Sequence, residues 1–114
     1  MGEFSKKYSV RGIRGATTVE SNSRDLIKDA TKELLEDMVS KNEVLSEDIA
    51  AVFFTTTSDI SDEFPAVAAR EMGWDTVPLI CGHEMAVPHG LAKCIRILIP
   101  VSYTHLTLPT KRIV

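Results

Sequence analysis

Arg96 stands within an otherwise apolar run that spans residues 95–99. A guanidinium buried in such a run needs a counter-charge, because an isolated charge in an apolar interior is too costly in free energy. Its partner is a protein carboxylate, a phosphate or carboxylate ligand, or solvent at the edge of a sheet. Arg96 is therefore a candidate anion-binding residue and also a candidate for a structural ion pair.

Three other charged residues raise the same question. Arg14 lies beside Gly15, which would let a ligand approach the backbone, although a surface arginine on an edge strand is the simpler explanation. Glu84 could orient a hydroxyl group or pair with Arg96. Arg70 fits the solvated face of a helix. A few arginines that converge on one cleft would make a positive site even in an acidic protein.

A metal site is a weaker alternative. Cys81, His83, His89 and Cys94 contain the right atoms, but their spacing matches no standard zinc pattern, and Cys94 fits a small buried residue within an apolar strand. We therefore expect no metal. The sequence also lacks a dinucleotide-binding glycine motif, a P-loop and a serine nucleophile elbow, which is consistent with a reaction that needs no nucleophile.

Length, net charge and the distribution of apolar residues limit which partners and which cellular location are expected. The 114 residues suit one domain, and the formal net charge of −3 argues against nucleic-acid binding. No stretch approaches the roughly 20 apolar residues of a membrane-spanning helix, and the first residues lack the apolar core of a secretory signal. We expect a cytoplasmic protein with no membrane partner, whose two cysteines are free thiols.

The elements that must position these residues can be read from periodicity. Alternation predicts a strand over residues 8–18, with Gly12 and Gly15 allowing close backbone approach or a bulge. Ser23 is a candidate N-cap for a long amphipathic helix that reaches Met38. A helical turn is expected at residues 46–49, and the apolar run at 50–57 favours a strand in a sheet covered by helices.

The second half of the chain continues this alternation. Pro65 suits the first turn of a short helix that ends at Met72 before Gly73, and strands are expected at residues 77–81 and 92–99. The order βαβαββ, with a minor helix, predicts an α/β (α+β) fold in which helices pack on a mixed β-sheet.

Four stretches of the sequence carry a resemblance to a known family. They are R-G-I-R-G-A-T-T-V-E at residues 11–20, F-P-A-V-A-A-R-E-M-G-W at 64–74, V-P-L-I-C-G-H-E-M at 77–85 and G-L-A-K-C-I-R-I-L at 90–98. In order and spacing they resemble the monofunctional chorismate mutases of the AroH class. Several matched stretches are far more specific than any one motif.

The resemblance implies an isomerase, an intramolecular transferase of the shikimate pathway that converts chorismate to prephenate for Phe and Tyr biosynthesis. This [3,3] rearrangement needs neither a cofactor nor a covalent intermediate. It implies a homotrimeric pseudo-α/β-barrel with active sites in the clefts between subunits. Catalysis would then consist of holding the dianionic substrate in its compact conformer and stabilising negative charge on the ether oxygen.

Site residues follow from positions in the matched stretches. Arg96 corresponds to the family's arginine at the ether oxygen, and Arg14 to an arginine at the substrate's carboxylate. Glu84 and Cys81 match groups that contact the ring hydroxyl. The resemblance thus predicts Arg96, Glu84 and Arg14 as catalytic residues and adds Cys81 as a substrate-binding residue.

Further positions match or depart from the family pattern. Phe64 and Arg70 match residues that border the cleft and are predicted to bind substrate. Val67 stands where lysine is frequent, and Ala86 where aspartate is usual. Both departures are expected to weaken substrate positioning without removing the main donors.

The resemblance ends near Pro100. We expect residues 1–100 to form a chorismate mutase domain that is incomplete at its C-terminus. Residues 101–114 resemble the translation of a transposon-based sequencing adapter joined to a truncated gene, so Tyr103 is not given the role of the family's C-terminal tyrosine. The alternative to an active mutase is a non-catalytic trimeric protein that binds small carboxylates.

Overall fold

The computed structural model describes the backbone of residues 5–107 and the side chains of residues 9–103. Its elements are, in chain order, β1 (Ser5–Thr18), α1 (Arg24–Lys41), the 3-10 turn η1 (Ser46–Asp48), β2 (Val52–Thr56), α2 (Ala66–Glu71), β3 (Leu79–His83) and β4 (Cys94–Thr107). The predicted order of strands and helices is confirmed. The strand boundaries differ from those expected: β1 begins at residue 5 rather than 8, β2 spans 52–56 rather than 50–57, β3 spans 79–83 rather than 77–81, and β4 spans 94–107 rather than 92–99.

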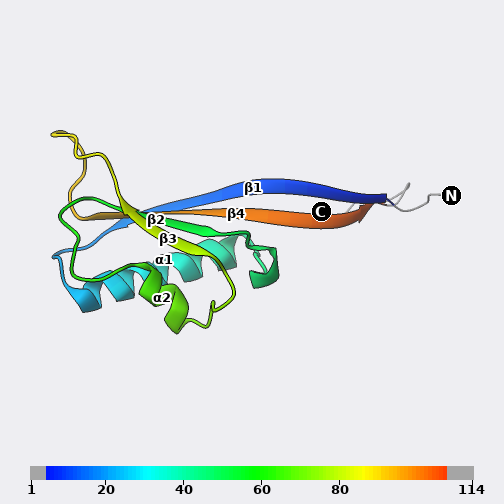
Figure 1. The fold of residues 1–114 in the computed structure, drawn as a ribbon, viewed down its shortest axis with the longest axis horizontal. Coiled ribbons are helices and arrows are strands. Elements are labelled where there is room, and N and C mark those ends of the chain that lie inside the picture. The colour runs from blue at the N-terminus through cyan, green and yellow to red at the C-terminus, as the bar shows by residue number, and fades with distance from the viewer. Residues whose placement is uncertain (1–4, 108–114) are drawn as a thin grey trace.

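The strands form one mixed sheet in the order β1-β4-β2-β3. β4 pairs antiparallel with both β1 and β2, whereas β2 and β3 are parallel. Parallel neighbours need a crossover connection, and α2 supplies it between β2 and β3. β1 and β4 run on together past the rest of the sheet as a two-stranded ribbon (Figure 1).

Helix α1 forms where the sequence predicts it. The Ser23 hydroxyl caps its first turn by accepting the backbone N–H of Leu26 at 3.4 Å. The helix buries one face on the sheet through the side chains Ile27, Thr31, Leu35 and Met38. Gly15 allows this contact, because a Cβ atom there would lie 2.8 Å from the Met38 sulfur. The predicted close approach at Gly15 is confirmed.

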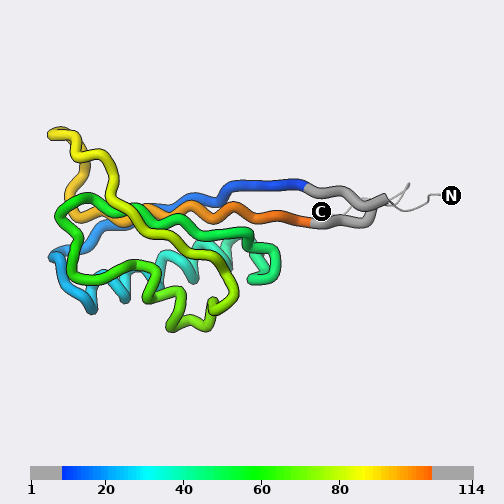
Figure 2. The backbone as a smooth tube through the Cα atoms, in the orientation of Figure 1, coloured from blue at the N-terminus to red at the C-terminus, as the bar shows by residue number. Residues whose placement is uncertain are grey.

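Both helices lie on the same side of the sheet (Figures 1 and 2). The sheet is thus covered by helices, as expected, but on one face only. Phe54 is buried under the helices, whereas Phe53, on the opposite face, is 41% exposed. A strand that helices cover on both faces and a strand with one open face can have the same apolar sequence. The sequence alone therefore does not show which faces of the strand are covered.

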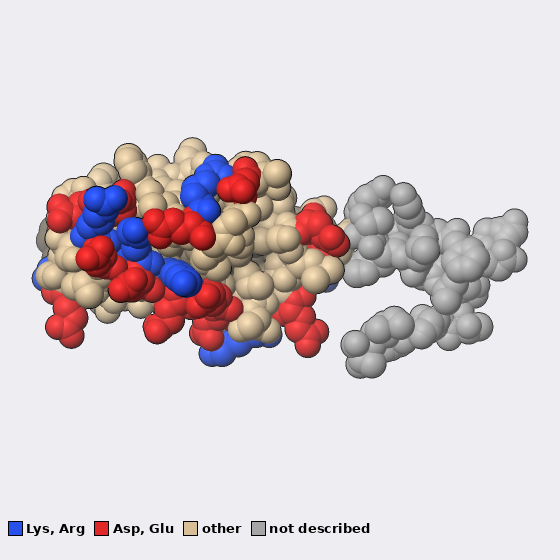
Figure 3. All heavy atoms as spheres, turned by 90° about the horizontal axis from the view of Figure 1, so that it is seen from below, with Lys and Arg blue, Asp and Glu red and all other residues tan. Residues whose placement is uncertain are grey.

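The outer surface of the helical layer is highly charged. Lysine and arginine side chains interleave with aspartate and glutamate across it (Figure 3). Ion pairs link the helices to neighbouring segments, with Lys28 Nζ 2.8 Å from Glu71 and Arg24 Nε 3.1 Å from Glu63. This side of the molecule has the character of a solvated surface. Among the described residues, no helix is both long and apolar enough to cross a membrane.

β4 passes through the predicted domain boundary at residue 100 without a break. Val101 is fully buried and forms a β-bridge with Ile49, and Tyr103 packs against the core. Residues 108–114 of the predicted foreign tail lie outside the described residues. The origin of residues 101–114 stays a prediction, because packing does not report on ancestry.

Candidate active site

Arg96 lies on the open face of the sheet, and its side chain is 50% exposed. Its expected burial is therefore wrong for this chain. Alternation along β4 points Ile95 and Ile97 toward the helices and Arg96 away from them. Of the three partners considered for the guanidinium, the structure provides a protein carboxylate together with solvent.

The carboxylate that meets Arg96 is Glu84, just beyond β3. Arg96 Nε lies 3.1 Å from Oε1 and 3.0 Å from Oε2 of Glu84. This hydrogen bond is the main cause that raises the pKa of Arg96 above its ordinary value. Within the described part of the chain, no protein acceptor engages the terminal Nη atoms of Arg96. They are available to an anion.

Arg14 lies on the same face as Arg96. In the β1–β4 register Arg14 is opposite Leu98 and Ala16 is opposite Arg96, so the two arginines are diagonal neighbours on adjacent strands. Both line an open hollow of about 790 Å³ on this face, with Phe53, Thr55 and Leu98. The structure thus brings together Arg14, Arg96 and Glu84, the three predicted catalytic residues.

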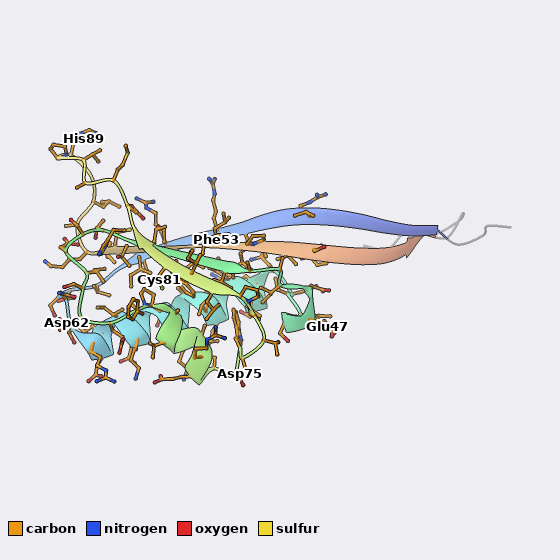
Figure 4. The ribbon with its side chains drawn as sticks, viewed as in Figure 1. Glu47, Phe53, Asp62, Asp75, Cys81 and His89 are labelled. Carbon is orange, nitrogen blue, oxygen red and sulfur yellow. The ribbon has the colours of Figure 1, made fainter. Side chains whose placement is uncertain are left out.

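Cys81 lies on the other face. The register aligns Cys81 with Phe54 and Ile97, whose side chains point toward the helices. Cys81 lies between the sheet and the helical layer (Figure 4). Burial raises the pKa of its thiol, and the backbone N–H of Ala66 only partly offsets this effect. A thiol with a raised pKa stays protonated at neutral pH and serves as a hydrogen-bond donor rather than a nucleophile.

Phe64 shares a second hollow with Cys81. This hollow has a volume of about 300 Å³ and is also lined by Asp62, Glu63 and His83. Phe64 precedes α2 and is 69% exposed. Four of the predicted substrate-binding residues therefore line two hollows on opposite sides of the sheet: Arg14 and Arg96 line one, and Cys81 and Phe64 line the other.

Arg70 has a local role within this chain. Its Nη1 donates to the carbonyl oxygens of Trp74 at 2.8 Å, Asp75 at 3.2 Å and Val77 at 3.4 Å. These bonds tie the end of α2 to the turn that leads into β3. The structure does not bring Arg70 to either Arg14 or Arg96.

The alternative of a metal site finds no support among the described residues, where no three His, Cys, Asp or Glu side chains are placed to hold an ion. Cys94 is buried at the start of β4, and His89 lies at the tip of a loop that projects from the sheet (Figure 4). The two cysteines are free thiols, as expected.

Comparison with known proteins agrees with this geometry. The family model described as chorismate mutase type I matches residues 10–112. The chain belongs to this family. The match extends past residue 100, where the motif resemblance ends.

Curated and solved members of the chorismate mutase family resemble the chain closely. Chorismate mutase AroH of Bacillus subtilis (strain 168) is 45% identical over 93 residues, which cover 81% of this chain and 73% of that protein. Chorismate mutase AroH of Thermus thermophilus is 49% identical over 90 residues, covering 78% and 74%. The structure of a chorismate mutase from Clostridium thermocellum is similar with a TM-score of 0.76 at 41% identity, covering 90% of this chain and 86% of that one.

Two long-range contacts, one of them at the site, were missed in the sequence. The Thr55 hydroxyl donates to Glu84 Oε2 at 2.6 Å. Asp59 accepts the backbone N–H of Lys93 through both carboxylate oxygens, at 3.0 and 3.1 Å, and so holds the start of β4. Neither Thr55 nor Asp59 lies in a recognisable sequence motif. Both contacts join segments that are far apart in the chain. Only knowledge of the strand pairing could have found them.

Proposed function

We propose that this chain catalyses the rearrangement of chorismate to prephenate. The observation that carries the proposal is the arrangement of Arg96, whose Nε is held by Glu84 and which lines the open hollow together with Arg14. Relatives that cover about four fifths of the chain are named chorismate mutases. The reaction would place this protein in aromatic amino-acid biosynthesis.

Each residue has a role that the chemistry requires. The reaction breaks a C–O bond and forms a C–C bond within one molecule, so no group has to be supplied from outside. Negative charge grows on the ether oxygen, and the Arg96 guanidinium is the donor that stabilises it, by about 3 to 4 kcal/mol for a single preorganised donor. Arg14 binds a substrate carboxylate, and Glu84 accepts the ring hydroxyl.

The remaining predicted residues complete the cleft. Cys81, whose raised pKa keeps it a neutral donor, contacts the hydroxyl region of the substrate, and Phe64 and Arg70 border the cleft. The residues that line the cleft hold the substrate in its compact conformer. The reaction is then faster, because the reacting atoms are already ordered before the bond forms. A thiol whose pKa is raised is a poorer nucleophile, which suits a reaction without a covalent intermediate.

We infer that the complete site needs two chains. Arg14, Arg96 and Glu84 are on the open face, whereas Cys81 and Phe64 are on the helix side, and one chain cannot present both groups to the same small molecule. The apolar side chains Phe53, Leu98 and Ile80 are exposed on the open face, which favours burial against a second copy. A homotrimer with sites at its interfaces, as in the family resemblance, meets both requirements.

The deciding experiment follows chorismate absorbance with the purified chain and with Arg96→Ala. We expect turnover by the first and a loss of about 10²–10³-fold in the variant, because one preorganised donor is removed. Equal turnover in both would remove Arg96 from the mechanism. Binding of chorismate without turnover would favour the alternative, a non-catalytic protein for small carboxylates. The cytoplasmic location stays a prediction, which fractionation of the source cells would test.

A further inference from the structure

Thr55 lies at the centre of the open face, directly opposite Arg96 in the β2–β4 pair and opposite Gly82 in the β2–β3 pair. Its hydroxyl has one proton, and that proton is donated to Glu84 Oε2 at 2.6 Å. Thr55 therefore contacts Glu84 from the strand that separates β3 from β4.

Glu84 is held from three directions. Its backbone N–H donates to the carbonyl of Thr56 at 2.8 Å, its Oε2 accepts the Thr55 hydroxyl, and both of its oxygens lie within reach of Arg96 Nε. Without the hydroxyl, the carboxylate would be anchored by Arg96 alone, and the pair could swing together into solvent because Arg96 is half exposed. Surface ion pairs without a third contact are weak and mobile.

We propose that Thr55 is a positioning residue for the reaction: it locks the Glu84 carboxylate so that the carboxylate in turn fixes the direction of the Arg96 guanidinium. This inference rests on the proposed function. Thr55 acts through Glu84 on Arg96, and Arg96 lines the hollow that Arg14 shares. If the Arg96 guanidinium is misdirected, it makes a weaker contact with the ether oxygen, and that contact is strongest in the transition state. The loss of Thr55 should therefore lower kcat more than it changes KM.

The test is a cycle of four proteins: the unaltered chain, Thr55→Val, Glu84→Gln and the double variant. Valine keeps the shape of threonine and suits a strand but lacks the hydroxyl. We expect Thr55→Val to lower kcat about 10-fold with little change in KM, since a hydrogen bond to a charged group is lost. In the Glu84→Gln background the same substitution should change kcat less than 2-fold or so, because the group through which Thr55 acts is already altered.

Two further variants separate positioning from structure. Thr55→Ser retains the hydroxyl and should keep kcat within about 3-fold of the unaltered chain, whereas Thr17→Val, on the side of β1 that faces the helices, should leave both constants unchanged. Thermal unfolding reports on folding of every variant, and Thr55→Ala replaces Thr55→Val if valine prevents folding. Loss of the fold in every variant without the hydroxyl would assign Thr55 a structural role and overturn the proposal.

The remaining outcomes are distinguishable. Equal kcat for Thr55→Val and the unaltered chain, or the same loss with and without Glu84→Gln, would overturn the positioning role while leaving the mutase activity intact. An unaltered chain that does not consume chorismate would instead refute the proposed function on which the inference rests.

Discussion

Arg96 on β4 and Cys81 on β3 lie on opposite faces of one sheet, although each occupies a position that matches a substrate-binding residue of the same family. The register is unambiguous, because Arg96 aligns with Thr55 on the open face and Cys81 aligns with Phe54 beneath the helices. Side chains on opposite faces of a sheet cannot contact one small molecule. The relationship makes assembly part of the catalytic hypothesis.

Mixing two inactive variants should restore activity if each site draws on two chains. Arg96→Ala removes the donor on the open face, and Phe64→Glu places a negative charge at the helix-side hollow, where an exposed side chain tolerates the change. We expect each variant alone to have little activity. Co-expression should recover about one quarter of the sites, since a random 1:1 mixture combines two unaltered halves with that frequency.

The control for this experiment carries both substitutions on one chain and is co-expressed with an equally tagged copy of itself. It should stay inactive. Activity in the mixture no higher than in the separate variants would place the complete site within a single chain.

Acid should destabilise the chain partly through Asp59. The hydrogen bond from the Thr57 hydroxyl, aided by the N–H of Lys93, lowers the pKa of Asp59 below its ordinary value of 3.8. A group whose pKa is depressed on folding stabilises the native state above the unfolded pKa and loses that effect as the pH falls through the folded pKa. Melting temperatures between pH 5 and pH 2 should therefore fall less steeply for Asp59→Asn than for the unaltered chain.

Asp29→Asn on the exposed side of α1 controls for the loss of one negative charge. The melting temperature of Asp29→Asn should depend on pH in nearly the same way as that of the unaltered chain, and more nearly so than that of Asp59→Asn. An identical acid dependence for Asp59→Asn and the unaltered chain would show that Asp59 does not couple folding to protonation.

Gly15 should not tolerate a side chain. A Cβ atom there would lie 2.8 Å from Met38 Sδ and 3.0 Å from Leu34 Cδ1, so α1 would have to move or repack. Overpacking of this kind costs about 1–3 kcal/mol, which exceeds the gain of roughly 0.4–1 kcal/mol from restricting the unfolded chain. Urea denaturation should show a lower free energy of unfolding for Gly15→Ala than for the unaltered chain.

Gly12→Ala is the matched control on the same strand, because the nearest atom to its added Cβ would be 3.5 Å away, an ordinary contact. It should be neutral or slightly stabilising. Equal free energies of unfolding for the two variants would mean that α1 does not pack on Gly15 as described.

Val101 should contribute to the core even though it follows the end of the motif resemblance. It is fully buried and bridges to Ile49, so Val101→Ala removes buried methyl groups and leaves a cavity. We expect a loss of about 2 kcal/mol in the free energy of unfolding. Ser102→Ala, on the exposed side of the same strand, should change the free energy of unfolding little. Equal effects of Val101→Ala and Ser102→Ala would place the end of the core before residue 101.

The local elements of this chain could be predicted because their signals lie within a few residues of one another. Ser23 caps α1 as its position indicated, Gly73 ends the α2 turn with a positive φ of 91°, and the spacing of apolar residues marks the buried face of α1. The matched stretches around Arg14, Glu84 and Arg96 likewise sufficed to indicate the family. Propensity, capping and periodicity are short-range effects that a single segment contains.

The exposure of Arg96 and the grouping of the site residues were decided by the tertiary structure. The sequence of an isoleucine-rich strand around an arginine is the same whether helices cover one face of the sheet or two. The contacts of Glu84 with Thr55 and Arg96 join β2, β4 and the segment after β3, which are far apart in the chain. The division between the Arg96 face and the Cys81 face is likewise a property of register, which depends on packing between distant segments. Sequence indicated which residues bear the chemistry, and the fold decided which of them one chain can bring together.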